Sequence, residues 1–311
     1  MGANKTLSRF QNIFLQDFKI MSDLVQMFKD LPLMLYANTR SVDEFEEFWR
    51  LNNITLGEIK CAEDGLLKKY LGKSEFTFSG YSEPSQETVS FQVNVVGGQI
   101  NWRESMLCPI TGLNNRSRAS ISILLRECGL TPNSNVYITE QTTVLWDWLK
   151  KFYPKAVGSE YYGSKCPLGD SHEGIRNEDM TKLTFPSSSF DVVASFDVLE
   201  HVPEYSHALF EVCRVIRSGG YLLMSFPFTG LNETLVRAKI NTDDAIEYLV
   251  EPEYHGDPLN SEGGILCYYH FGFDILKSLL EVGFSDAKVV WIWSRSLGYL
   301  GGMQPYIVAK K

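Results

Sequence analysis

A turn in the middle of the chain, Glu140 to Thr143, lies between a predicted strand and a predicted helix in the segment VYITEQTTVLWDWL. A nucleotide-binding α/β domain normally carries its glycine-rich loop at this place, but the segment contains no glycine. Glu160 in VGSEYY follows about 20 residues on, the spacing at which a carboxylate accepts hydrogen bonds from ribose hydroxyls. We therefore expect a nucleoside ligand above this turn, with a solvated strand end as the alternative interpretation of Glu160.

A second group of residues has the spacing of a zinc site without its chemistry. Ser82 and Ser85 are separated by two residues, and so are Cys108 and Thr111. Paired Cys-x-x-Cys knuckles at such a separation hold zinc through thiolates. Only one of the four positions is a cysteine, and hydroxyls are poor zinc ligands at neutral pH. We expect a knuckle-like fold without metal, or a coincidence of spacing.

Predicted strands and helices, which must position the turn at 140–143, alternate regularly from Asn135 onward. They are, in order, a strand at 136–139, a helix at 143–152, strands at 156–160 and 190–196, a helix at 204–216, a turn at 218–220 and a strand at 221–228. Strands that alternate with helices predict an α/β domain with a parallel sheet and helices on both of its faces. A helix that ends at Gly283 and two final strands, which can pair antiparallel, complete the domain.

The residues before this domain predict helices and small hairpins. Apolar residues recur three and four positions apart from Phe10 to Leu35, which predicts an amphipathic helix that could mediate a homodimer. Ser41 followed by Glu44 is a capping box that begins a second helix. At 76–102 the residues alternate with a period of two and are interrupted by turn residues, which predicts short antiparallel strands.

Composition and charge narrow the class of protein. The 311 residues are 44% hydrophobic and 22% charged, which is globular, and we divide them into an N-terminal region at 1–110 and an α/β domain at 111–311. The net charge of −9 and the scattered basic residues argue against a nucleic-acid partner. Six widely spaced cysteines, and no apolar run of about 18 to 20 residues, predict a reduced cytoplasmic protein without a membrane span.

A run of motifs follows from Asn177 to Phe228: an acidic residue, LTF, SFD, VLEHV, RVIRSGG and a final strand. In this order they resemble class I S-adenosylmethionine-dependent methyltransferases of the type 11 group. With the preceding strand and helix and the tail, the resemblance extends over about Asn135 to Lys311 and implies a Rossmann-like, mostly parallel seven-stranded sheet. The chain departs from the family at Ser218, where proline is usual, and in the missing glycines of the first turn.

The resemblance implies S-adenosylmethionine as the cofactor, S-adenosylhomocysteine as its product, and no metal. It implies that Glu160 binds the ribose diol. It also places Asp179 near the adenine amine and the Met180 backbone at the edge of the adenine ring. The other cofactor-binding candidates lie at the turn and at strand ends: Glu140, Gln141, Thr143, Tyr161, Ser195 and Phe196. We also expect the Thr143 hydroxyl to cap the helix that follows.

Glu140 favours this cofactor over a dinucleotide. A glycine turn lets backbone amides close on a pyrophosphate, whereas Glu140 would oppose a pyrophosphate both sterically and by charge. S-adenosylmethionine has no phosphate, and it carries a positive sulfonium and an α-ammonium group. A carboxylate is therefore tolerable at this position.

Methyl transfer from a sulfonium depends first on alignment, and it needs a base only where the acceptor must lose a proton. The candidates are His201 in LEHV, His255 with Asp257 in PEYHGDP, and, with less weight, His270. Each histidine has a structural alternative, namely a helix contact, a loop-anchoring hydrogen bond or a packed ring. The long insertion at 229–266 is interpreted as a lid or an acceptor-binding segment.

The sequence favours methyl transfer to a hydroxyl or amine of a small molecule or sugar derivative. Two alternatives stay open. The altered turn also fits a non-catalytic, methyltransferase-like binding or scaffold protein. A third hypothesis is an enzyme that cleaves or cyclises S-adenosylmethionine instead of transferring its methyl group.

Overall fold

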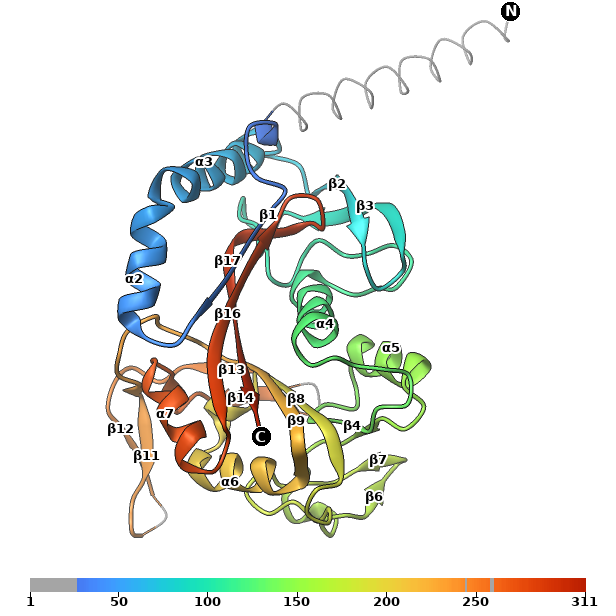
Figure 1. Ribbon diagram of the computed structural model, residues 1–311, viewed down its shortest axis with the longest axis vertical. Helices are drawn as coiled ribbons and strands as arrows, with labels where there is room; N and C mark the ends of the chain where they lie inside the picture. The colour runs from blue at the N-terminus through green and yellow to red at the C-terminus, as the bar shows by residue number, and fades with distance from the viewer. Residues whose placement is uncertain (1–26, 244, 258–259) are drawn as a thin grey trace, which may run out of the picture. The chain divides into compact units, whose positions relative to one another are not determined.

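The computed structural model describes residues 27–243, 245–257 and 260–311, and it leaves the side chains of 257–262 undescribed (Figure 1). This part of the chain divides into two compact units. The first unit consists of the described residues up to Tyr36 together with Trp49–Ala119 and Ile292–Gln304, and the second consists of Ala37–Phe48, Ser120–Trp291 and Pro305–Lys311. All residues named above for cofactor binding and catalysis belong to the second unit.

The central element is a seven-stranded sheet with the order β1-β16-β17-β9-β8-β4-β5. Its strands are β1 (Met34–Thr39), β4 (Val136–Ile138), β5 (Val157–Gly158), β8 (Phe190–Phe196), β9 (Ile216–Ser225), β16 (Asp286–Ser294) and β17 (Tyr299–Lys310). The neighbours β5, β4, β8 and β9 pair in parallel, and β17 pairs antiparallel with β9. The prediction of an α/β fold with a mostly parallel, seven-stranded sheet is confirmed.

The strands β4 and β8 are largely apolar along their length, as expected for parallel strands covered on both faces. Every residue of β4 is buried, and so is every residue of β8 except Asp191. A strand of this kind shows a continuous apolar run rather than alternation, which is why the sequence pattern located it. The accompanying helices are α4 (Asn115–Glu127), α5 (Val144–Phe152), α6 (Tyr205–Val215) and α7 (Asp274–Glu281).

Two helix starts agree with their sequence signals. Thr143 is the N-cap of α5, and its hydroxyl accepts a hydrogen bond from the Trp146 backbone N–H at 3.2 Å, so the predicted cap is confirmed. Ser41 precedes α2 (Val42–Leu51) and its hydroxyl accepts a hydrogen bond from the Glu44 backbone N–H at 3.2 Å. The Glu44 carboxylate accepts in turn from the Arg40 N–H at 2.7 Å.

Two predictions of secondary structure are wrong. The expected turn at 218–220 lies inside β9, where Gly219 has a φ of 79° and the ladder with β8 shifts its register. The Gly219 N–H donates to the Lys311 carbonyl oxygen, so the last residue of the chain holds this bulge in place. The predicted helix at 10–35 ends early, since its last two residues are in β1, after Pro32. Its residues up to 26 lie outside the described part.

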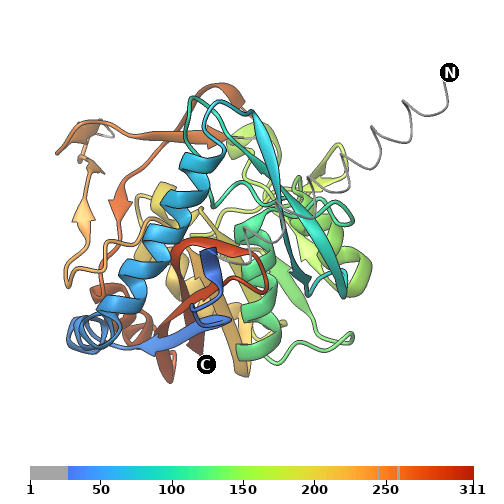
Figure 2. The same ribbon diagram turned by 90° about the horizontal axis from the view of Figure 1, so that it is seen from above.

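The first unit combines α3 (Asn53–Lys69) with the ladder of β2 (Glu75–Ser82) and β3 (Glu87–Asn94), as Figure 2 shows in blue and cyan. Its core includes the buried side chains of Leu66, Phe91 and Trp293. The predicted antiparallel pairing at 76–102 is confirmed for these two strands. Two of the positions with zinc-knuckle spacing are in contact, since the Cys108 thiol donates a hydrogen bond to Ser82 Oγ at 3.5 Å.

The insertion between β9 and α7 folds into short antiparallel ladders. They join β10 (Leu235–Val236) to β15 (Tyr269–His270), β11 (Ala238–Ile240) to β12 (Ile246–Tyr248), and β13 (Tyr254–Asp257) to β14 (Asn260–Leu266). A further small hairpin, β6 (Ser171–His172) with β7 (Ile175–Arg176), follows the 3₁₀ turn η1 (Gly163–Lys165). The insertion thus presents His255 on β13 and His270 on β15.

Candidate active site

The turn after β4 is closed by Glu160 rather than by glycine. One oxygen of the Glu160 carboxylate accepts hydrogen bonds from the Gln141 N–H at 2.7 Å, the Thr142 N–H at 2.9 Å and the Thr142 hydroxyl at 2.8 Å. A carboxylate oxygen can satisfy several donors at once, and bonds to an ionised group are the stronger ones. Glu160 therefore holds the turn in shape from the end of the neighbouring strand.

Gln141 ties the same turn to the β6–β7 hairpin. Its side-chain Nε2 donates to the Gly174 carbonyl oxygen at 3.1 Å, and its Oε1 accepts from the Arg176 N–H at 2.9 Å. Both ends of the amide are used, so Gln141 serves as a brace between two loops. Its predicted contact with a cofactor stays a prediction.

The glycine that this turn requires lies on the adjacent strand. Glu140 follows β4 and is 9% exposed. A Cβ atom on Gly158 of β5 would lie 3.0 Å from the Glu140 carbonyl oxygen and 2.9 Å from the Trp146 ring. The contact with the Trp146 ring is closer than real Cβ atoms make, and the contact with Glu140 is tighter than most, so Gly158 lets the turn and α5 pack closely on the backbone of β5.

Hydrogen bonds of buried side chains join the ends of β4 and β8. Ser195 is 1% exposed, and its hydroxyl accepts from the Thr139 hydroxyl at 2.9 Å and donates to the Met180 sulfur at 3.8 Å. Asp179 accepts from both the N–H and the hydroxyl of Thr181, at 2.8 and 2.7 Å. The structure thus brings Met180 and Ser195 into contact. Of the other two candidates, the Phe196 side chain is buried and the Tyr161 side chain is 63% exposed. Their cofactor contacts stay predictions.

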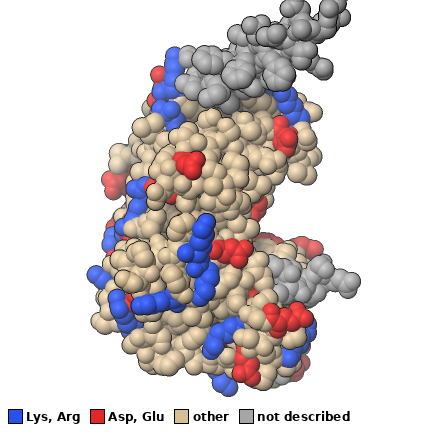
Figure 3. All heavy atoms as spheres, turned by 90° about the vertical axis from the view of Figure 1, so that its right-hand side faces the viewer, with Lys and Arg blue, Asp and Glu red and all other residues tan. Residues whose placement is uncertain are grey.

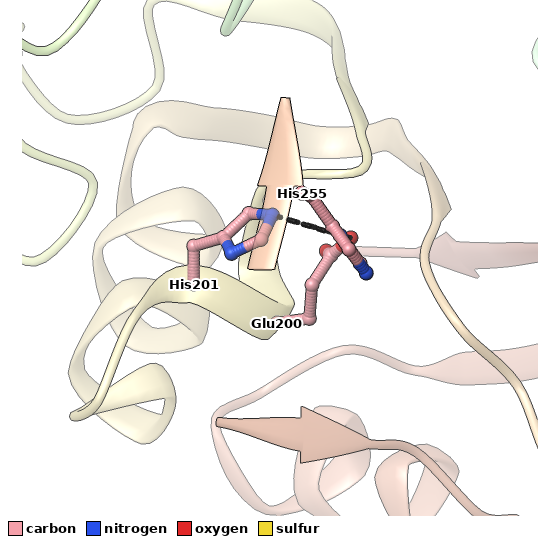
Figure 4. Close-up of side chains that lie close together, drawn as sticks. All are labelled: Glu200, His201 and His255. Atoms are coloured by element: carbon pink, nitrogen blue, oxygen red, sulfur yellow. Dashed lines mark hydrogen bonds and ion pairs between the residues drawn. The ribbon is translucent and has the colours of Figure 1, made fainter. Parts of the chain in front are cut away.

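His201 and His255, which the sequence proposed separately, lie against each other (Figure 4). His201 ends the 3₁₀ turn η2 (Leu199–His201) just after β8, and His255 comes from β13 of the insertion. The distance from His201 Nε2 to His255 Nδ1 is 3.2 Å, and the rings are perpendicular. Asp257, the third catalytic candidate, ends β13, but its side chain is not among those described.

Glu200 completes this group, and sequence reasoning missed it. Its side chain is completely buried, with Oε1 at 3.7 Å from His201 Nε2 and at 3.5 Å from His255 Nδ1. Within the described residues neither carboxylate oxygen has a hydrogen-bond partner. The sequence offers one signal for it, an acidic residue directly before His201 within the otherwise apolar run VLEHV.

The outward-facing nitrogens of both histidines are held by acceptors. His201 Nδ1 lies 2.9 Å from the Leu266 carbonyl oxygen, and His255 Nε2 lies 2.9 Å from Glu253 Oε1. Glu200 is the main reason that the pKa of His255 rises to about 9, against the lowering effect of burial, and Glu253 adds to the rise. The hydrogen bond with His255 lowers the pKa of Glu253.

Further contacts fix this shell. Glu253 Oε2 lies 3.1 Å from His270 Nε2 and 3.2 Å from Arg237 Nη2, so the third candidate histidine reaches the cluster through Glu253. The Cys267 N–H donates to the Glu253 carbonyl oxygen at 2.8 Å. The Cys267 thiol donates to the backbone, and burial raises its pKa to about 11, so it is protonated at neutral pH.

The face drawn in Figure 3 is largely uncharged and carries both acidic and basic side chains. Among the described residues, no helix has both the length and the apolar character that a membrane crossing demands.

Residues 159–224 match the family model described as a methyltransferase domain. The chain therefore carries a methyltransferase domain. The match begins one residue before Glu160 and ends within β9, so it includes Ser195 and His201 but not His255. This finding confirms the resemblance to class I methyltransferases that the motifs between Asn177 and Phe228 indicated.

A relative is similar to this chain over a short stretch. The chain is 40% identical to a probable S-adenosylmethionine-dependent methyltransferase of Mycolicibacterium smegmatis over 53 residues. These residues make up 17% of this chain and 21% of that protein. The chain thus matches about a fifth of the length of this curated relative.

Solved structures are similar to this chain at low identity. An S-adenosylmethionine-dependent methyltransferase from Mesorhizobium loti is 13% identical, with a TM-score of 0.36, and the match covers 62% of this chain and 96% of that one. The structure of PigF with SAH is 17% identical, with a TM-score of 0.33, and the match covers 57% of this chain and 51% of that one. These scores are low, and the fold assignment follows from the sheet itself.

Proposed function

We propose that this protein transfers a methyl group from S-adenosylmethionine to a hydroxyl or amine of a small molecule or sugar derivative. The observation that carries the proposal is the methyltransferase-domain match over residues 159–224, in which Glu160 stands at the carboxyl end of a parallel strand beside the first turn. Ligands of doubly wound sheets bind at this edge, where strand order reverses.

The turn fits a phosphate-free, cationic nucleoside better than a dinucleotide. The N–H groups of Gln141 and Thr142, which would face a pyrophosphate in a glycine loop, both donate to Glu160. The second oxygen of Glu160, which accepts no hydrogen bond from the described residues, is left to accept from a ribose hydroxyl. Glu140 adds negative charge at the end of β4, which suits a sulfonium and an ammonium group.

The chain's own residues orient the reactants and handle a proton. When bound, S-adenosylmethionine supplies an electrophilic methyl group: its sulfur–carbon bond breaks, the sulfur keeps the electron pair, and the acceptor oxygen or nitrogen bonds to the carbon while its proton leaves. Thr139, Ser195 and Met180 fix the strand ends that would align this displacement. We propose that the cluster around His201 and His255 accepts the proton that the acceptor loses. Asp257 is a further candidate for this role because of its position on β13.

Acceptor recognition is assigned to the insertion at 229–266, because it delivers His255 to the cluster through its ladders. Loops at the carboxyl side of such sheets commonly bind substrates. We also place the protein in the cytoplasm, as its six free cysteines suggest.

Titration calorimetry with S-adenosylhomocysteine tests the cofactor half of the proposal. The full chain should bind it, and Glu160→Gln should weaken binding by about 10- to 100-fold, because a charge-assisted hydrogen bond contributes about 1.5–3 kcal/mol. The amide oxygen of the variant still accepts from the turn, which separates ligand binding from turn stability. Glu281→Gln is the matched control, since Glu281 is exposed beside Lys277 on α7. Absence of binding at millimolar ligand, or equal affinities for both variants, would refute the proposal.

A further inference from the structure

Three acceptor atoms converge in the histidine cluster, defined as Glu200, His201 and His255. A carbonyl oxygen can only accept, so His201 donates its Nδ1–H to Leu266 and presents a bare Nε2 inward when neutral. His255 donates its Nε2–H to the Glu253 carboxylate, and its Nδ1 is bare once the ring gives up the proton that its raised pKa of about 9 retains at neutral pH. Without that proton, two lone pairs and the Glu200 Oε1 oxygen face one another, so a proton or a metal ion competes for the same place.

Such an arrangement needs a cation at its centre. A buried carboxylate without a hydrogen-bond donor is costly, and so is the close approach of two bare nitrogens. Only an added proton or a metal ion can satisfy all three atoms together. A single proton placed between the nitrogens at 3.2 Å would still leave both Glu200 oxygens without a hydrogen bond of normal length.

We propose that Glu200, His201 and His255 bind a divalent transition-metal ion, for which zinc is the best match. The three donor atoms are separated by 3.2, 3.5 and 3.7 Å. Tetrahedral zinc with ligand distances of about 2.0–2.1 Å requires donor separations of about 3.3–3.4 Å. The site therefore needs shifts of only a few tenths of an ångström to receive the ion.

The surroundings have the outer shell that metal-binding histidines require. Such histidines donate their other N–H to a carboxylate or a backbone carbonyl, which fixes the tautomer and raises the basicity of the ligand. His255 uses Glu253 in this way, and His201 uses the Leu266 carbonyl. The Tyr268 N–H also donates to the Glu200 carbonyl oxygen at 2.7 Å, so backbone hydrogen bonds hold η2 against the end of the insertion.

A neighbouring set, Glu253, His255 and Cys267, also has its ligand atoms close together. It is the weaker site, because His255 already donates to Glu253 and the protonated Cys267 thiol donates to the Tyr269 carbonyl oxygen. Metal binding here would require the loss of both hydrogen bonds. Cys267 therefore serves as a control position rather than as a ligand.

The ion would have a defined role if the proposed methyl transfer holds. Two histidines and one carboxylate leave a tetrahedral position open, as in catalytic zinc sites. An acceptor oxygen bound there would lose its proton at a lower pH, which makes it a better nucleophile. This role rests on the proposed function, whereas metal binding itself does not. In the metal-bound protein this role replaces that of the histidines as the acceptor of the proton, because both inward ring nitrogens are then ligands. The metal site also revises the expectation of no metal that the family resemblance gave.

Metal titration of the chelator-treated full chain tests the site. We expect one equivalent of zinc per chain, and cobalt in its place should give the visible absorption of a tetrahedral ion. Glu200→Gln and His201→Gln should each weaken zinc binding by more than about 100-fold, because outer-shell changes alone cost about 10- to 100-fold. Far-UV circular dichroism checks that each variant is folded, and Cys267→Ser should bind zinc as the unchanged protein does.

Three results would overturn the proposal. The first is that the chain takes up no stoichiometric zinc, cobalt or manganese. The second is that Glu200→Gln and His201→Gln both leave metal uptake unchanged. The third is that Cys267→Ser abolishes metal uptake. The calorimetric titration with S-adenosylhomocysteine is read separately. A chain that binds zinc but no S-adenosylhomocysteine keeps the metal site and loses the proposed function, and the converse result does the opposite.

Discussion

The knuckle around Cys108 in the first unit and the histidine cluster in the second unit are opposite cases. The knuckle has the spacing of a zinc site, yet its atoms satisfy one another. The Cys108 thiol donates to Ser82 Oγ at 3.5 Å, and Ser85 Oγ lies 4.0 Å from the sulfur. Burial by itself would raise the pKa of the Cys108 thiol, but its hydrogen bonds with Ser82 and Thr111 outweigh this effect, and the net pKa is lowered.

The ligand atoms of the histidine cluster come from residues without a recognisable sequence spacing, and among the described residues neither oxygen of Glu200 has a hydrogen-bond partner. His201 and His255 are 54 positions apart, and no pattern in the sequence connects them. When both rings are neutral, their inward nitrogens are acceptors, as are the oxygens of Glu200. The comparison teaches why we place the proposed metal by the balance of donors and acceptors and not by ligand spacing.

The largest effect is expected from completing the knuckle with thiols. In a Glu200→Gln background, the triple change S82C, S85C and T111C should take the chain from no bound zinc to one tightly bound equivalent. Four thiolates suit zinc, and structural zinc sites in zinc-finger peptides bind with about 10–16 kcal/mol. Zinc content after dialysis gives the measurement. If the variant folds and stays free of zinc, the four positions do not converge as described.

A smaller effect is expected from the outer shell of the histidine cluster. Glu253→Gln should weaken zinc binding by about 10- to 100-fold, because the His255 Nε2–H would lose its carboxylate partner. Competition with a chromophoric chelator measures this change. Glu247→Gln is the control, since Glu247 lies in the same insertion but pairs with Lys239. Equal affinities for the two variants would show that Glu253 does not support a metal ligand.

The smallest effect is expected from Cys108 itself. Cys108→Ser keeps a donor toward Ser82, so the free energy of unfolding should change by about 1 kcal/mol or less. Zinc content should not change, because the thiol is not a ligand. Urea unfolding and metal analysis of the same samples give both values. A fall in bound zinc would move the metal site from the histidine cluster to the knuckle.

The fold could be predicted largely from the sequence, because buried parallel strands such as β4 and β8 leave continuous apolar runs. The bulge at 218–220 could not, since it depends on pairing with the end of the chain. His201 and His255 were found as single residues through their chemistry. Glu200 was not found, because its burial follows from how η2 packs against the insertion, which is a long-range contact that no local pattern records.

Anomalous X-ray diffraction from zinc-soaked crystals, collected on both sides of the zinc absorption edge, tests the central claim most directly. The account predicts one strong peak per chain, about 2.0–2.2 Å from Glu200 Oε1, His201 Nε2 and His255 Nδ1. A difference map without a peak between these atoms, with the two histidine nitrogens still in hydrogen-bond contact, would contradict it.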